Sequence, residues 1–127
     1  MAVGMTRELD IPVPEALQRT KEALAEQGFG TITEINIQQT LAEKIGKEIE
    51  EYTIIGACNP NYAAKALDSD RSVGLMLPCN VVVRATEGGS LVEAFDPRSA
   101  MQMPGFEAMG EIADDVRSLL QAALDSL

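Results

Sequence analysis

Residues 52–60, YTIIGACNP, contain a strand followed directly by the start of a helix. The first half is rich in β-branched and aromatic side chains, which favour a pleated strand over a helix. Asn59 and Pro60 then form a helix-start signal, because Asn caps free backbone amides and Pro fits the first helical turn. Both faces of the strand are mostly apolar, so we expect it to lie inside a sheet.

Upstream of this segment the pattern predicts two strands and two helices. Residues 7–11 alternate like a half-buried strand that ends at Pro12, and residues 29–37 are again β-branched. Between them, apolar residues at helical spacing predict a helix from Pro14 that Gly28 terminates. A short helix over 38–45, ended by Gly46, completes this half.

Downstream, a helix from Pro60 is expected to stop at the polar run 68–70. Strands are predicted over 74–84 and 91–95, joined by a hairpin turn at 87–90. Helical spacing from Met109 to Leu127 predicts the longest helix, packed across one face of the sheet. The hairpin favours an α+β fold, with one mainly antiparallel sheet of about four or five strands and both the N-terminal helix and the long C-terminal helix packed on it.

Composition limits the possible functions. A length of 127 residues with 46% hydrophobic residues suits a single domain over 1–127. The net charge of −10 disfavours nucleic acids and anionic membranes as partners. Without a single histidine, the chain has no His-based catalytic triad and no His metal ligand. With no signal peptide or membrane-spanning stretch, we expect a cytoplasmic protein.

The two cysteines, Cys58 and Cys79, are the main candidates for chemistry. Cys58 directly precedes a predicted helix N-terminus, where the dipole and free amides lower the pKa of a thiol. Cys79 follows Pro78 in another predicted strand; if the two strands are neighbours, the sulfurs share one pocket or come within disulfide reach. The competing interpretation is that both are small buried core residues, and Asn59 and Asn80 serve caps and turns.

Other residues give weaker signals. Glu34, flanked by isoleucines, is either a partly buried acid or an edge-strand residue that points to water. Met101 and Met103 are interpreted as an adaptable apolar rim or as core filling. No cluster of ligands indicates a metal and no glycine-rich loop indicates a nucleotide, so we expect neither a metal nor a cofactor.

Several motifs in order resemble one known family. GFG at 28–30, IIGACNP at 54–60, LPCN at 77–80 and the pair Asp96-Pro97 together resemble the prokaryotic family known as domain of unknown function 302. The resemblance implies a small α+β domain that commonly self-associates and has no established activity. The motif positions Glu34, Cys58, Asn59, Pro60, Pro78, Cys79 and Asn80 are all intact here.

Three hypotheses for the function follow. The first is a binding domain, expected to be a homodimer, that holds a small molecule or a sulfur-containing group near Cys58, Asn59, Cys79, Asn80 and Glu34. The second is a thiol redox enzyme or sulfur carrier in which Cys58 is the reactive thiolate and Cys79 resolves it. The third is a structural or interaction module with inert cysteines. Whether the protein is an enzyme stays open at this point.

Overall fold

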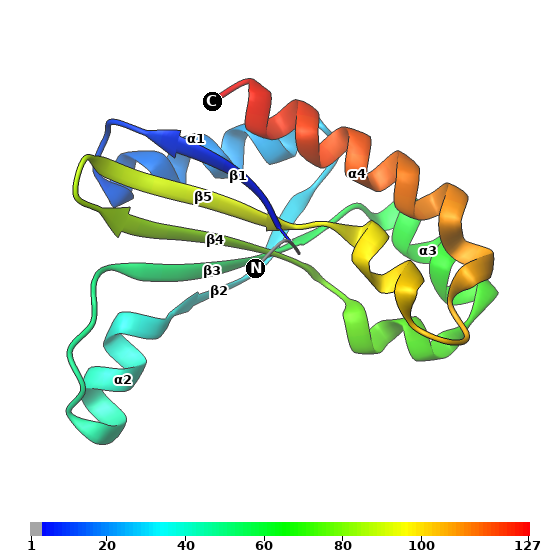
Figure 1. Ribbon diagram of the computed structural model, residues 1–127, viewed down its shortest axis with the longest axis horizontal. Coiled ribbons are helices and arrows are strands. Elements are labelled where there is room, and N and C mark those ends of the chain that lie inside the picture. Colours follow the sequence, from blue (N-terminus) through cyan, green and yellow to red (C-terminus); the bar gives the residue numbers. More distant parts are fainter. Residues whose placement is uncertain (1–3) are drawn as a thin grey trace.

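The computed structural model describes residues 4–127 and shows an α+β protein built on one sheet (Figure 1). The strands are β1 (Gly4–Leu9), β2 (Gly30–Asn36), β3 (Tyr52–Cys58), β4 (Cys79–Thr86) and β5 (Gly89–Phe95). The α-helices are α1 (Val13–Glu26), α2 (Ile37–Ile45), α3 (Pro60–Ser69) and α4 (Gly110–Asp125). Three short 3₁₀ helices cover Arg71–Met76, Pro97–Gln102 and Glu107–Met109.

The five strands lie in the order β1-β5-β4-β3-β2, and every neighbouring pair is antiparallel. This confirms the predicted antiparallel sheet, with β3 in its interior and a two-residue turn at Glu87 and Gly88 between β4 and β5. α4 is the longest helix, as the apolar spacing predicts.

The main core lies between the sheet and the helices α1 and α4. On the sheet, alternate residues such as Ile55, Val83 and Val92 are fully buried, as the two-residue period of a strand requires. They pack against Ala16 of α1 and Leu120 of α4, which are buried as well. α2 stands apart from this layer, beyond the β2 edge of the sheet (Figure 1).

The strand expected over 74–84 is wrong in its first part, because β4 begins only at Cys79. Residues 71–76 form a 3₁₀ helix instead, and its start is capped by the Asp70 carboxylate, which accepts a hydrogen bond of 2.9 Å from the Ser72 amide. Pro78 has no amide to donate to a ladder, so pairing starts after it. Leu75, within this 3₁₀ helix, is 87% exposed.

Candidate ligand site

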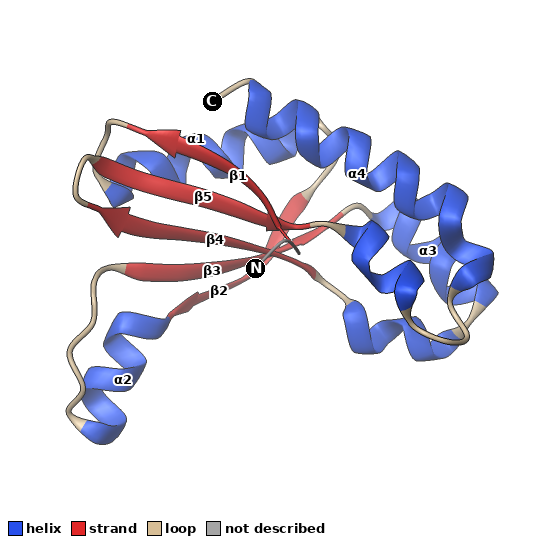
Figure 2. Cartoon of the chain, in the orientation of Figure 1, coloured by secondary structure: helices blue, strands red, loops and turns tan. Residues whose placement is uncertain are grey.

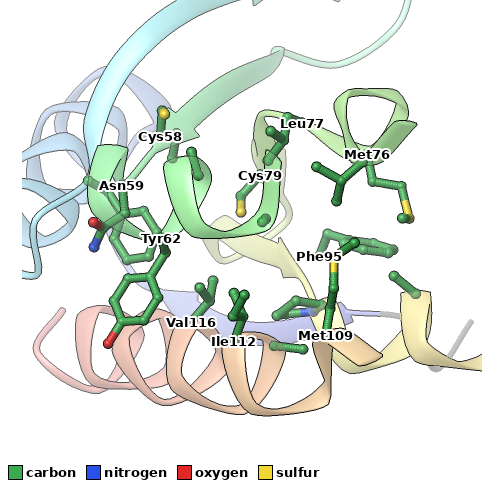
Figure 3. Close-up of a pocket in the computed structure, with 18 of the residues that line it drawn as sticks. Cys58, Asn59, Tyr62, Met76, Leu77, Cys79, Phe95, Met109, Ile112 and Val116 are labelled. Atoms are coloured by element: carbon green, nitrogen blue, oxygen red, sulfur yellow. The ribbon is translucent and has the colours of Figure 1, made fainter. Parts of the chain in front are cut away.

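An apolar cavity of about 90 Å³ lies at one end of the sheet (Figure 3). Figure 2 shows that beyond this end the chain is nearly all helix, formed by α3, the 3₁₀ helices and the start of α4. The sheet contributes Ala57 and Cys58 from the end of β3, Cys79 from the start of β4 and Phe95 from the end of β5.

The cavity separates two groups of packed side chains. On one side is the main core, represented at the wall by Phe29, Ala57 and Val116. On the other side is a smaller cluster around Val73 and Met109, to which the 3₁₀ helices contribute. Two clusters that meet without filling the space between them leave an internal site of this kind.

Cys79 faces the cavity. It lies directly opposite Ala57 in the β3–β4 ladder, so the two side chains share the face of the sheet that carries the core. Figure 3 shows its sulfur directed into the cavity. Burial, and then the nearby Cys58, raise the pKa of the Cys79 thiol from 9.0 to about 11. At neutral pH, Cys79 is therefore an undissociated thiol.

Cys58 belongs to the cavity wall, but its sulfur points away from the cavity (Figure 3). Successive residues of a strand point to opposite faces, so Cys58 lies on the other face from Ala57 and hence from Cys79. Both cysteines are free, and both are partly buried. The strands are neighbours as expected, yet their register directs the two sulfurs to different sides.

Asn59 also contributes to the cavity wall, and it has a structural role that the capping interpretation did not describe. It occupies the N-cap position of α3, but its side chain makes no capping hydrogen bond. Its Nδ2 instead donates to the Gln27 carbonyl oxygen at 3.3 Å. It also lies against Gly28, whose φ of 89° is a conformation that glycine adopts without strain. The amide thereby ties the end of α1 to the start of α3.

The other two candidate residues lie outside the cavity wall. Asn80 follows Cys79 in β4, so it faces the opposite side of the sheet, where it is exposed and lies opposite Gly56. Glu34 is exposed on the edge strand β2 and forms an ion pair with Lys21 of α1. Of the five residues expected at a ligand site, the structure thus brings Cys58, Asn59 and Cys79 together.

The cavity wall contains side chains that the sequence did not single out as a group. Met76, Met101 and Met109 come from the 3₁₀ helices, and Ile112 comes from α4. Met101 was predicted as part of an adaptable rim; Met103, its expected companion, is 48% exposed and lies outside the wall. Alternating methionines near Met101 were the only local signal for this part of the site.

No charged side chain lines the cavity among residues 4–127. Tyr62 is one of the polar residues in the wall. Its hydroxyl donates to a carboxylate oxygen of Asp115 at 3.5 Å, and the Lys65 ammonium lies 5.1 Å from its ring centre. Within the same described range, no three Cys, Asp or Glu side chains are grouped as a metal site would require. The arrangement is suited to an uncharged molecule.

Comparisons with known proteins agree with the fold. The family model for the Domain of unknown function DUF302 matches residues 5–127. A solved structure of an uncharacterized conserved DUF302 protein from Bacillus stearothermophilus is similar, with a TM-score of 0.91, 30% sequence identity and 98% of each chain covered. No curated protein matches the sequence.

Over residues 4–127, no helix has both the length and the apolar character needed to cross a bilayer.

Proposed function

The chain belongs to the family described as domain of unknown function DUF302, and we propose that its cavity beside Cys79 binds a small, uncharged, mainly apolar molecule. The observation that carries this proposal is an apolar cavity whose wall holds no charged side chain among the described residues. Ligand sites are typically concave and mostly apolar, with few polar groups. An ionised ligand would lose its hydration there without gaining a partner.

The size of the cavity limits the ligand. A volume of about 90 Å³ suits a single small ring or a short alkyl chain. The methionines in the wall are flexible and polarisable, so they adapt to ligands of different shape and favour aromatic or sulfur-containing ones.

The geometry supports binding over thiol exchange. A resolving thiol must reach the sulfur of the first cysteine and attack as a thiolate. Cys79 points to the other face of the sheet from Cys58 and stays protonated at neutral pH. We therefore assign Cys79 the role of a weak hydrogen-bond donor and soft contact in the wall.

Benzene and thiophene are suitable probes, because they are uncharged, nearly equal in size and differ by a sulfur atom. We expect either probe to shift amide resonances of Ala63, Cys79 and Ile112 in two-dimensional NMR and to raise the melting temperature. A tighter fit for thiophene would extend the proposal to sulfur-containing ligands.

Two neighbouring residues of α3 provide a matched pair of variants. Ala63 lines the cavity, whereas Ala64 is exposed and does not. Ala63→Leu should fill the cavity and abolish probe binding, while Ala64→Leu should leave it unchanged. Equal binding by the wild type and Ala63→Leu, or no cavity-specific shifts with either probe, would overturn the proposal.

A further inference from the structure

The segment from Gly30 to Ile45, here called the β2–α2 arm, exposes unusual amounts of apolar surface. Every residue of β2 is exposed, and α2 has no buried residue. Ile32, Ile35 and Ile45 are 60%, 46% and 69% exposed, so this short segment holds three of the five large hydrophobic residues that are exposed in residues 4–127. Clustered exposed apolar side chains mark interaction surfaces.

Local contacts hold the arm in a defined shape. The Asn36 side chain accepts a hydrogen bond of 2.9 Å from the Gln39 amide at the start of α2, and Gly46 ends the helix with a φ of 66°. Nine residues are nevertheless too few for a stable helix without packing. Figure 1 shows α2 clear of α1 and α4. The arm is therefore preformed, yet its contacts within residues 4–127 leave every residue of α2 at least partly exposed.

Strand β2 is also an edge of the sheet, paired on one side with β3; its register shifts between Thr31 and Thr33, so the regular stretch open to a second strand is 33–36. An edge strand with apolar, β-branched side chains readily pairs with another strand. A second copy of the same strand meets it antiparallel when a two-fold axis relates the two chains, and such an interface closes after two copies. The arm is thus self-complementary in its backbone.

The distribution of charge favours a second copy of this chain as the partner of the β2–α2 arm. The protein carries a net charge of −10, so two copies repel each other at most surfaces. The arm contains only Glu34, Glu43 and Lys44 as charged residues, and Glu34 is neutralised by its ion pair with Lys21. A basic partner would be attracted to the acidic surfaces instead. The electrically neutral arm suits a partner that is itself acidic.

We propose that two copies of this chain associate through their β2–α2 arms, with the β2 strands antiparallel across a two-fold axis. Ile32, Ile35 and Ile45 of each copy become buried in this interface. The arm begins opposite Cys58 of the cavity wall, but none of these three isoleucines lines the cavity, so the association does not require a ligand there.

Sedimentation equilibrium over a wide range of concentrations tests the proposal. We expect the wild type to reach twice the mass of one chain, and added salt to tighten the association by screening the repulsion. Ile32→Glu and Ile45→Glu each put an unpaired carboxylate into a surface that becomes buried on association, so the dissociation constant should rise by roughly 100-fold. Leu75→Glu is the control, because Leu75 is equally apolar and 87% exposed but lies outside the arm.

Circular dichroism checks that each variant folds, which is expected because the substituted side chains are exposed. A wild type that stays monomeric at every concentration would overturn the proposal. So would a dimer that both arm variants leave intact, or one that only Leu75→Glu disrupts. If added salt weakens the dimer, ion pairs hold the interface together. That result would also contradict the proposal that the electrically neutral β2–α2 arm forms it.

Discussion

Ala57 of β3 lies directly opposite Cys79 of β4 in the antiparallel ladder. This pairing places Cys79 on the face of the sheet that packs against α1 and α4, and it leaves Cys58, the next residue along β3, on the other face. A register shifted by one residue would have put both sulfurs on the same side. The two thiols therefore have different surroundings, which gives each a separate chemistry to test.

Alkylation of Cys79 by iodoacetamide should be slow at neutral pH. The reactive species is the thiolate, and the pKa of this thiol is raised to about 11 by burial and by Cys58. In the wild type, the rate at Cys79, followed on its own peptide, should rise about tenfold per pH unit toward pH 11. At pH 7 it should be about 100-fold or more below the rate in the unfolded chain.

Mass spectrometry of the labelled peptides measures these rates, and unfolding in urea supplies the reference. Rapid, pH-independent labelling of Cys79 in the native protein would contradict a protonated thiol. It would also restore the sulfur-carrier hypothesis, which requires a reactive thiolate.

The stability of the protein should fall as pH rises from about 9 to about 11. The Cys79 thiol holds its proton in the folded state up to about pH 11, whereas the unfolded chain releases it near 9.0. The folded state thus binds more protons in this window, so alkali favours unfolding. The full effect is about 2–3 kcal/mol in the free energy of unfolding.

Urea denaturation across this pH range measures the effect, and Cys79→Ala isolates it from other titrating groups. The variant should be less stable at neutral pH because it leaves a larger cavity, but it should lack this contribution to the alkaline loss. The Cys58→Ser variant should keep most of the alkaline loss of stability, because Cys79 is still present. Parallel pH curves for the wild type and Cys79→Ala would contradict the raised pKa.

Local sequence signals were sufficient for most of the fold. The β-branched run of β3 and the Asn59-Pro60 pair located one strand and the helix after it, and glycines marked the ends of α1 and α2. The 3₁₀ helix at 71–76 was missed, because Leu75, Leu77, Cys79 and Val81 follow one another at the two-residue spacing of a strand. The cap at Asp70 and the missing amide of Pro78 outweighed that alternation.

The candidate site was predicted only in part, since its geometry depends on contacts distant in sequence. Neighbouring strands bring Cys58 and Cys79 to one end of the sheet, but the register that separates their sulfurs comes from the pairing of Ala57 with Cys79, 22 positions apart. Once Cys79 faces inward, Asn80 must face outward. The pairing of Glu34 with Lys21 and the methionine wall likewise arise from tertiary packing that no local pattern encodes.

Gly56→Ala should destabilise the fold. In the ladder Gly56 lies opposite Thr33 on one side and Asn80 on the other, and the space for a Cβ is already occupied by Thr33 Oγ1 and Pro78 Cγ. Thr33 and the Pro78 ring must move to admit the methyl group, and such overpacking costs about 1–3 kcal/mol. Urea denaturation measures the loss. Gly74→Ala is the control, since no atom lies within 4 Å of its added Cβ; equal stabilities for the two variants would contradict this packing.

Arg7→Met should loosen the attachment of α4 to the edge of the sheet. From β1, the Arg7 guanidinium donates hydrogen bonds to the carbonyl oxygens of Leu127 at 2.6 Å and Leu124 at 3.4 Å, at the end of the helix where carbonyls lack partners within it. A cation there also interacts favourably with the helix dipole. Methionine keeps the apolar stem but loses both effects, so the free energy of unfolding should fall by about 1–2 kcal/mol.

Thermal denaturation and hydrogen exchange measure this effect, and exchange should accelerate most in the last turn of α4. Arg19→Met is a matched control on α1, because Arg19 bonds only to Glu15 one turn away, at 3.3 Å on an exposed face. Such a pair contributes about 0.3–0.5 kcal/mol. If both variants lose the same small amount and exchange in α4 is unchanged, Arg7 does not hold the helix, and its docking depends on apolar contacts such as Leu120 against the sheet alone.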